Sequence, residues 1–242
     1  MRPVLFKWRS LTVWSYPAMV YLGLVAGVVA GNVAAHAAGL NAFRVYVATL
    51  ILFVPSLIGA KLFFVVSHWR HYRQGQRRIF NPQEGGAAQY GGLLLVLPSS
   101  TPVLAALHLR VGSYWDVGIF TILVLMIFGR IGCLLNGCCG GRPSGSRLSL
   151  RLPNDSGVWD RRIPTQFLEI GLALFLLFCA IAARRLMLFP GALFLLVTAG
   201  YAFGRVFLEF TRESYAGRFS IHQSISVALV IVSVTALIVR WP

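Results

Sequence analysis

Long apolar runs are the feature that most constrains how this chain folds. Seven stretches of the 242 residues approach or exceed the ~20 apolar residues that a helix needs to cross a bilayer. We therefore expect an all-α polytopic membrane protein with seven transmembrane helices, forming a single membrane-embedded domain over residues 1–242. The predicted spans are 13–35, 45–67, 91–109, 114–130, 165–183, 189–210 and 221–239.

The third predicted span is interrupted by proline. Pro98 and Pro102 enclose Ser99, Ser100 and Thr101, and each proline removes a backbone donor from the helix. We expect this span to be kinked or partly re-entrant, which membranes tolerate where other helices surround the break.

The chain is strongly basic, with 22 Lys and Arg against 7 Asp and Glu. These residues lie mainly in short loops between spans, so the expected partner is the membrane, through the headgroups of anionic lipids, and no nucleic acid. Twenty of the 22 are arginines, whose planar guanidinium groups bind phosphate at two points. Loop charge that only sets the topology is the alternative explanation.

Polar side chains in or beside the spans gather at the end of the bundle that carries the N-terminus. At the far end there is little beyond Arg44, His108, Asp116, Arg184 and Arg185. This asymmetry predicts a site at one depth, opening to one leaflet. The polar residues at the N-terminal end are Tyr16, Lys61, Tyr90, Arg130, Asn136, Gln166, Glu169, Arg205, Glu209, His222 and Gln223.

Residues 129–141 carry an arginine at membrane depth, followed by glycines, cysteines and an asparagine. We expect the fourth span to end at Arg130. Arginine at a helix centre costs roughly 2.5–3.5 kcal/mol on insertion scales, so it marks a candidate site; a snorkelling arginine before a turn is the alternative. Arg205 and Glu209, four residues apart, are expected to form an ion pair on one helix face.

Three cysteines, Cys133, Cys138 and Cys139, fall within seven residues. Zinc sites usually take four ligands in two spaced pairs, and no histidine lies close in sequence, so we predict no metal site. We interpret the cysteines as small buried residues at a tight backbone crossing. A Cys133–Cys138 disulfide is the alternative in an oxidising compartment. We expect no cofactor.

Six motifs, in order and at the predicted span ends, resemble the phosphatidylglycerol–prolipoprotein diacylglyceryl transferase family. The resemblance implies a multi-pass enzyme of the bacterial inner membrane, with its site facing the periplasm. It implies transfer of a diacylglyceryl group from phosphatidylglycerol to the thiol of a lipobox cysteine in an acceptor protein, releasing glycerol-1-phosphate. The motifs are Trp14-Ser15-Tyr16, Gly59-Ala60-Lys61-Leu62, Gly91-Gly92-Leu93, the run 129–138, the run 164–169 and the run 204–210.

The resemblance also implies the residues of the site. Arg130 and Arg205 would grip the departing phosphate and Glu209 would orient Arg205, while Asn136 and Tyr16 would complete the catalytic group. The implied substrate-binding residues are Lys61, Tyr90, Gly91, Gly92, Gly132, Gly140, Gln166 and His222.

The chain departs from the family pattern at three positions. Tyr90 stands where the family has a histidine, Cys133 where it has an asparagine and Cys138 where it has an acidic residue. With an unperturbed pKa of about 10, tyrosine is a poor replacement for a histidine base, so no residue is assigned as the proton acceptor. These departures motivate one alternative, the same donor with another acceptor (a glycan, a lipid or a small thiol). A non-enzymatic transporter or channel is a separate alternative, which would favour a polar path through both leaflets.

Loop charge disagrees with the orientation that the family implies. Fourteen Lys and Arg residues lie at the N-terminal end of the predicted bundle and five at the far end. The positive-inside rule would place the N-terminal end in the cytoplasm. We follow the family, because arginines gathered at an anionic-lipid site would distort this count.

Overall fold

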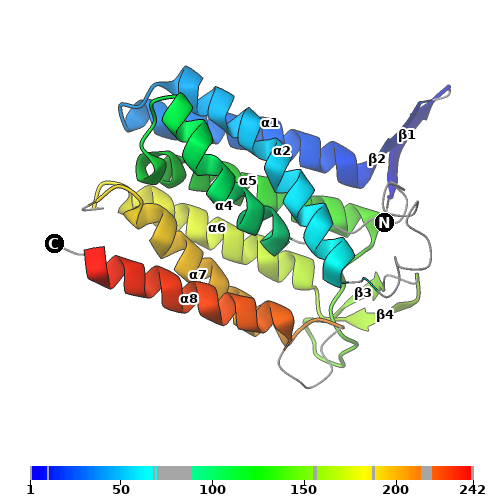
Figure 1. Ribbon diagram of the computed structural model, residues 1–242. Coiled ribbons are helices and arrows are strands. Elements are labelled where there is room, and N and C mark those ends of the chain that lie inside the picture. The colour runs from blue at the N-terminus through cyan, green and yellow to red at the C-terminus, as the bar shows by residue number, and fades with distance from the viewer. Residues whose placement is uncertain are drawn as a thin grey trace.

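The structure is a computed structural model. It describes residues 2–9, 11–67, 69, 89–154, 157–186, 189–213 and 220–240. In Figure 1 the remaining residues are drawn as a thin grey trace.

Seven helices make up most of the described chain, which confirms the prediction of an all-α polytopic membrane protein. Six are long and apolar enough to cross a membrane, and the apolar part of α4, Tyr90–Ala106, is shorter. All predicted helix ends but one lie within three residues of the observed ends. The helices are α1 (Ser15–Ala37), α2 (Ala42–Ser67), α4 (Gln89–Ala106), α5 (Val111–Asn136), α6 (Thr165–Ala183), α7 (Ala192–Glu209) and α8 (Ile221–Arg240).

Helix α4 continues through the two prolines that we expected to interrupt it. Serine hydroxyls next to the prolines bond back to the helix: Ser99 Oγ donates to the Leu95 carbonyl at 2.8 Å. The Trp115 indole of α5 donates to Ser100 Oγ at 3.1 Å. The bond from Trp115 anchors this part of α4 to α5.

Helix α5 extends six residues beyond Arg130, where the sequence had predicted its end. Gly129 and Gly132 each cost about 1 kcal/mol of helix propensity relative to alanine, but helix packing outweighs this. At Gly132 a Cβ would lie 3.1 Å from Met19 Cβ of α1, so this glycine lets the two helices approach closely. The helix ends at Gly137, which has the left-handed φ of 77° that favours glycine.

Small residues set the closest helix contacts. Gly23, Gly27 and Gly31 recur every four residues along α1 and face α5, a spacing that membrane helices use to pack closely. A Cβ on Gly27 would lie 2.7 Å from the Thr121 carbonyl oxygen, and Thr121 Oγ1 donates to the Gly27 carbonyl at 2.9 Å. The α1–α5 pair therefore forms a fixed wall.

Two β-hairpins, which the sequence analysis did not predict, lie at the N-terminal end of the bundle (Figure 1). One pairs β1 (Val4–Trp8) with β2 (Leu11–Trp14) and the other pairs β3 (Leu150–Pro153) with β4 (Trp159–Arg162), both antiparallel. The amide of Arg2 donates to the Leu135 carbonyl at 2.9 Å, which ties the first hairpin to the end of α5.

Candidate active site

Five charged side chains meet at the end of the bundle that carries the N-terminus, where α5 and α7 end and α6 begins. We call them the arginine–glutamate cluster: Arg130, Glu169, Arg205, Glu209 and Arg212. Glu169 is its centre. One of its carboxylate oxygens pairs with Arg130 Nε, and the other accepts from Arg205 at 3.3 Å and from Arg212 at 2.9 Å. Three segments far apart in sequence are thereby joined through one carboxylate.

The last turns of α7 supply the second carboxylate. Arg205 pairs with Glu209 four residues later at 3.1 Å, as the spacing predicted. Arg212 Nε lies 3.7 Å from the same carboxylate, and Ser220 Oγ donates to its other oxygen at 3.2 Å. Glu209 therefore fixes Arg205 and links the cluster to the start of α8.

The cluster is buried and has an excess of positive charge. Glu169 and Glu209 are 1% and 3% exposed and Arg205 is 5% exposed. Buried charges are costly unless they are paired, and here three guanidinium groups face two carboxylates. Burial alone would lower the pKa of Arg212, but the Glu169 carboxylate outweighs it and holds this pKa above its ordinary value. One excess positive charge thus stays in place.

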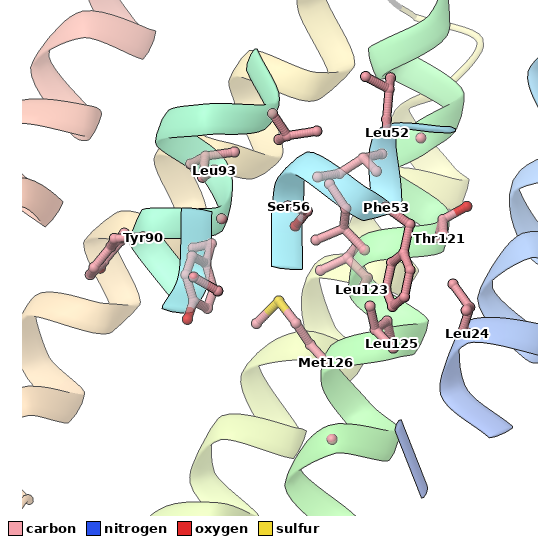
Figure 2. A pocket seen from close by; sticks show the side chains of 18 of the residues that line it. Leu24, Leu52, Phe53, Ser56, Tyr90, Leu93, Thr121, Leu123, Leu125 and Met126 are labelled. Carbon is pink, nitrogen blue, oxygen red and sulfur yellow. The ribbon is translucent and has the colours of Figure 1, made fainter. Parts of the chain in front are cut away.

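A cavity of about 430 Å³ lies beside the cluster, between α1, α2, α4, α5 and α7. Most of its lining is apolar; Figure 2 shows Leu52 and Phe53 of α2 with Leu125 and Met126 of α5 around the hollow. Its lining includes Leu57, which is 52% exposed, so the cavity reaches the outer surface of the bundle. An apolar hollow that opens to the surface of membrane helices suits acyl chains.

Four of the predicted site residues line this cavity: Tyr16, Tyr90, Gly92 and Arg130. Tyr90 is buried; its hydroxyl bonds to that of Ser226 of α8. Its ring stacks on His222, with centroids 6.0 Å apart. Arg130 is the member of the arginine–glutamate cluster that also lines the cavity, so it joins the two parts of the site.

The other predicted residues lie behind or away from the cavity wall. Gln166 is buried and its amide donates to the Cys138 carbonyl at 2.8 Å, and a Cβ on Gly140 would lie 3.1 Å from the Pro153 carbonyl. Asn136 is exposed at the last residue of α5, and Gly91 faces Gly59 where α4 crosses α2. The predicted residues that are not part of the described lining are Lys61, Gly91, Gly132, Asn136, Gly140, Gln166, Arg205, Glu209 and His222.

Sequence reasoning missed the central role of Glu169 and the contribution of Arg212. Glu169 follows Gln166 by three residues on α6, so it shares a helix face with a side chain that was selected. An acidic residue inside an apolar span was the signal that could have found it. Arg212 lies after the end of α7, where the spacing gives no indication that it turns back to Glu169.

The chain resembles known proteins over almost its whole length. A family model described as prolipoprotein diacylglyceryl transferase matches residues 3–239. A Dehalococcoides mccartyi phosphatidylglycerol–prolipoprotein diacylglyceryl transferase is 30% identical, over 96% of this chain and 90% of the relative. A Clostridium perfringens protein named phosphatidylglycerol–prolipoprotein diacylglyceryl transferase 2 is 27% identical, over 96% of this chain and 92% of the relative. A Clostridium tetani protein of the same name, without the number, is 25% identical, over 97% of this chain and 96% of the relative.

Proposed function

The chain belongs to the prolipoprotein diacylglyceryl transferase family, and we propose that it moves the diacylglyceryl group of phosphatidylglycerol to a lipobox cysteine of an acceptor protein. The acyl chains lie in the cavity between α1, α2, α4, α5 and α7. The phosphate lies at its charged end, within reach of Arg130.

The chemistry requires positive charge at that end. The acceptor thiolate attacks the carbon of the diacylglyceryl group that carries the phosphate oxygen. A carbon–sulfur bond forms there, and the bond from this carbon to the phosphate oxygen breaks. The phosphate begins with one negative charge and leaves, as glycerol-1-phosphate, with two. Groups placed where charge develops lower the barrier more than groups that bind substrate and transition state equally.

One observation carries the proposal: Arg130 lines the cavity and belongs to a cluster with one excess positive charge. The excess matches the single charge of a phosphodiester. Arg205 and Arg212 hold Glu169, and Glu209 holds both of these arginines. All three act as positioning residues, because they set where Glu169 and so the guanidinium of Arg130 lie. Tyr16 and Tyr90 supply neutral hydrogen-bonding groups on the cavity wall.

The test is product identity. The purified protein in vesicles receives phosphatidylglycerol with a labelled diacylglyceryl group and a lipobox peptide, and mass spectrometry follows the peptide. We expect a thioether-linked diacylglyceryl peptide from wild type and from Arg44→Ala, an exposed arginine at the far end. Arg130→Ala is expected to lose at least about 100-fold in rate, as when one charge-stabilising donor is removed. Label lost from the donor with the peptide unmodified would contradict the proposed acceptor.

The proposed location is the bacterial inner membrane, with the arginine–glutamate cluster facing the periplasm. Leu148, 81% exposed beside β3, and Leu186, 70% exposed between α6 and α7, lie at opposite ends of the bundle. Leu148→Cys should react with an impermeant maleimide in cells whose inner membrane is intact, and Leu186→Cys only after it is breached. The reverse pattern would place the site in the cytoplasm. Wild type, with its own four cysteines, gives the background.

A further inference from the structure

We infer that Cys133, Cys138 and Cys139 form a zinc site on the wall of the cavity, and that its open coordination position takes the thiol of the acceptor. This inference rests on the proposed function for the identity of the acceptor. The chain has Tyr90 where the family has a histidine, and tyrosine is a poor base. The zinc would give the chain another way to activate the thiol of the acceptor.

The three sulfur atoms are already close together. The Sγ atoms of Cys133, Cys138 and Cys139 all lie within 4.8 Å of one another, and the four cysteines, all of them described, form no disulfide. In a tetrahedral site with zinc–sulfur bonds of about 2.3 Å the sulfur atoms are about 3.8 Å apart. The observed separations are therefore at most about 1 Å wider than those around one zinc ion.

The end of α5 explains why these residues meet. The amide of Cys138 donates to the Cys133 carbonyl at 3.1 Å, and that of Gly137 to the Leu134 carbonyl at 3.3 Å. This pair of bonds is the Schellman motif, which turns the chain back over the last helical turn. Gln166 then holds the Cys138 carbonyl at 2.8 Å, so a buried side chain of α6 fixes the turn.

The backbone of Cys139 supports a role beyond packing. Its φ is 61°, in the left-handed region, which a residue with a Cβ adopts at a cost of roughly 1 kcal/mol. Cys139 is one of three non-glycine residues with positive φ in the described chain. This conformation places Cys139 on the cavity wall together with Cys133 and Arg130. A metal held by the three sulfurs would be accessible from the cavity.

Three thiolates with one open position are a catalytic arrangement rather than a closed structural one. Thiolates favour soft metals such as zinc, and catalytic zinc sites keep three protein ligands and one exchangeable position. A thiol that binds zinc there is deprotonated: its proton passes to a zinc-bound hydroxide, which leaves as water. The bound sulfur then attacks the donor carbon, and the electron pair of the broken carbon–oxygen bond leaves with the phosphate. The thioether product is a weak ligand and dissociates.

Metal content tests the site independently of activity. The full-length protein is purified in detergent under reducing conditions, washed with a mild chelator and analysed for metals. We expect about one zinc per chain in wild type and in Cys179→Ser, a cysteine of α6 outside the cluster. Cys138→Ala and Cys139→Ala should each lower the zinc content at least about ten-fold. Because both residues are only partly buried, these variants test the site even if Cys133→Ala fails to fold.

Cobalt(II) reports the fourth ligand. Cobalt-loaded wild type should show intense thiolate-to-cobalt charge-transfer absorption, which a lipobox peptide should increase and the same peptide with serine for cysteine should not. Four results would each overturn the inference. Wild type could be free of metal, or wild type and Cys139→Ala could hold equal amounts of zinc. Two of the three cysteines could form a disulfide, or the cobalt spectrum could fail to respond to the cysteine peptide. Modified peptide from metal-free wild type would leave the proposed function standing, whereas zinc binding without modified peptide would reject that function alone.

Discussion

The two ends of the bundle both contain a buried or half-buried carboxylate at a helix junction, but they use it differently. At the far end, Asp116 accepts from the backbone amides of Gly191 at 2.7 Å and Phe194 at 3.0 Å, at the start of α7. At the N-terminal end, Glu169 of α6 is shared by three arginines, one from α5 and two from the end of α7 and the residues just after it.

The difference shows how a structural carboxylate can be told from one that serves a site. Asp116 satisfies the free amides of a helix start, where a negative charge is stabilised by the helix dipole, and its environment needs no further ligand. Around Glu169 and Glu209, cations outnumber anions and one of them, Arg130, reaches a cavity. An unbalanced cluster next to a hollow is suited to an anionic ligand. The predictions below test this contrast, beginning with the largest effect.

Removing the charge at the centre of the cluster should have the largest effect. Glu169→Gln leaves the buried Arg205 and the half-buried Arg130 and Arg212 with one carboxylate, and breaking a buried ion pair typically costs about 3–5 kcal/mol. We expect a large fall in the thermal unfolding midpoint in detergent and loss of transfer activity. If Glu169→Gln unfolds at the wild-type temperature, the carboxylate is not the centre of the cluster.

The conservative change Arg205→Lys, at a residue behind the cavity wall, should have the next largest effect, a fall in kcat. Arg205→Lys keeps the charge but loses the fork that contacts Glu169 and Glu209 together. Misplacement of Arg130 through Glu169 should lower kcat by about 10- to 100-fold, with a smaller change in KM. Steady-state kinetics in phosphatidylglycerol vesicles measure both. A change in KM alone would assign Arg205 to substrate binding instead.

The far end should affect stability without affecting catalysis. Asp116→Asn weakens the bonds to the start of α7, and the loss of such a cap costs about 1 kcal/mol. We expect a small fall in the unfolding midpoint and an unchanged rate per folded molecule. A ten-fold loss of rate would mean that the two ends are coupled.

The smallest effect is expected at Tyr90. Tyr90→Phe removes the bond to Ser226 but keeps the ring on the cavity wall and its stacking on His222. A hydrogen bond of this kind contributes about 1 kcal/mol, so the rate should change less than about ten-fold. Complete loss of activity would instead make the Tyr90 hydroxyl a participant in proton transfer.

Helix positions were predictable from sequence because apolar length depends on residues close together in the chain. The exception is the end of α5, predicted at Arg130 and found at Asn136. Glycines signal a break on propensity alone, but Gly132 is retained in the helix because Tyr16 and Met19 of α1 pack against it. Such contacts between distant residues override local preference.

The site was predictable only in part. Arg130, Tyr16, Tyr90 and Gly92 were selected and line the cavity, because depth in the membrane and motif order place them at one end. Spacing along the chain gave no reason to place Asn136 on the outside. The convergence of three arginines on Glu169 depends on how α5, α6 and α7 pack, which no local pattern encodes.

The central claim is that the arginine–glutamate cluster binds the phosphate of a lipid whose acyl chains fill the cavity. An experimental structure of the protein with bound phosphatidylglycerol tests it most directly. We predict phosphate oxygens within hydrogen-bonding distance of the Arg130 guanidinium and acyl density along Leu52 and Met126. A phosphate bound elsewhere, with Arg130 still paired only to Glu169 and the cavity empty of acyl chains, would contradict the account.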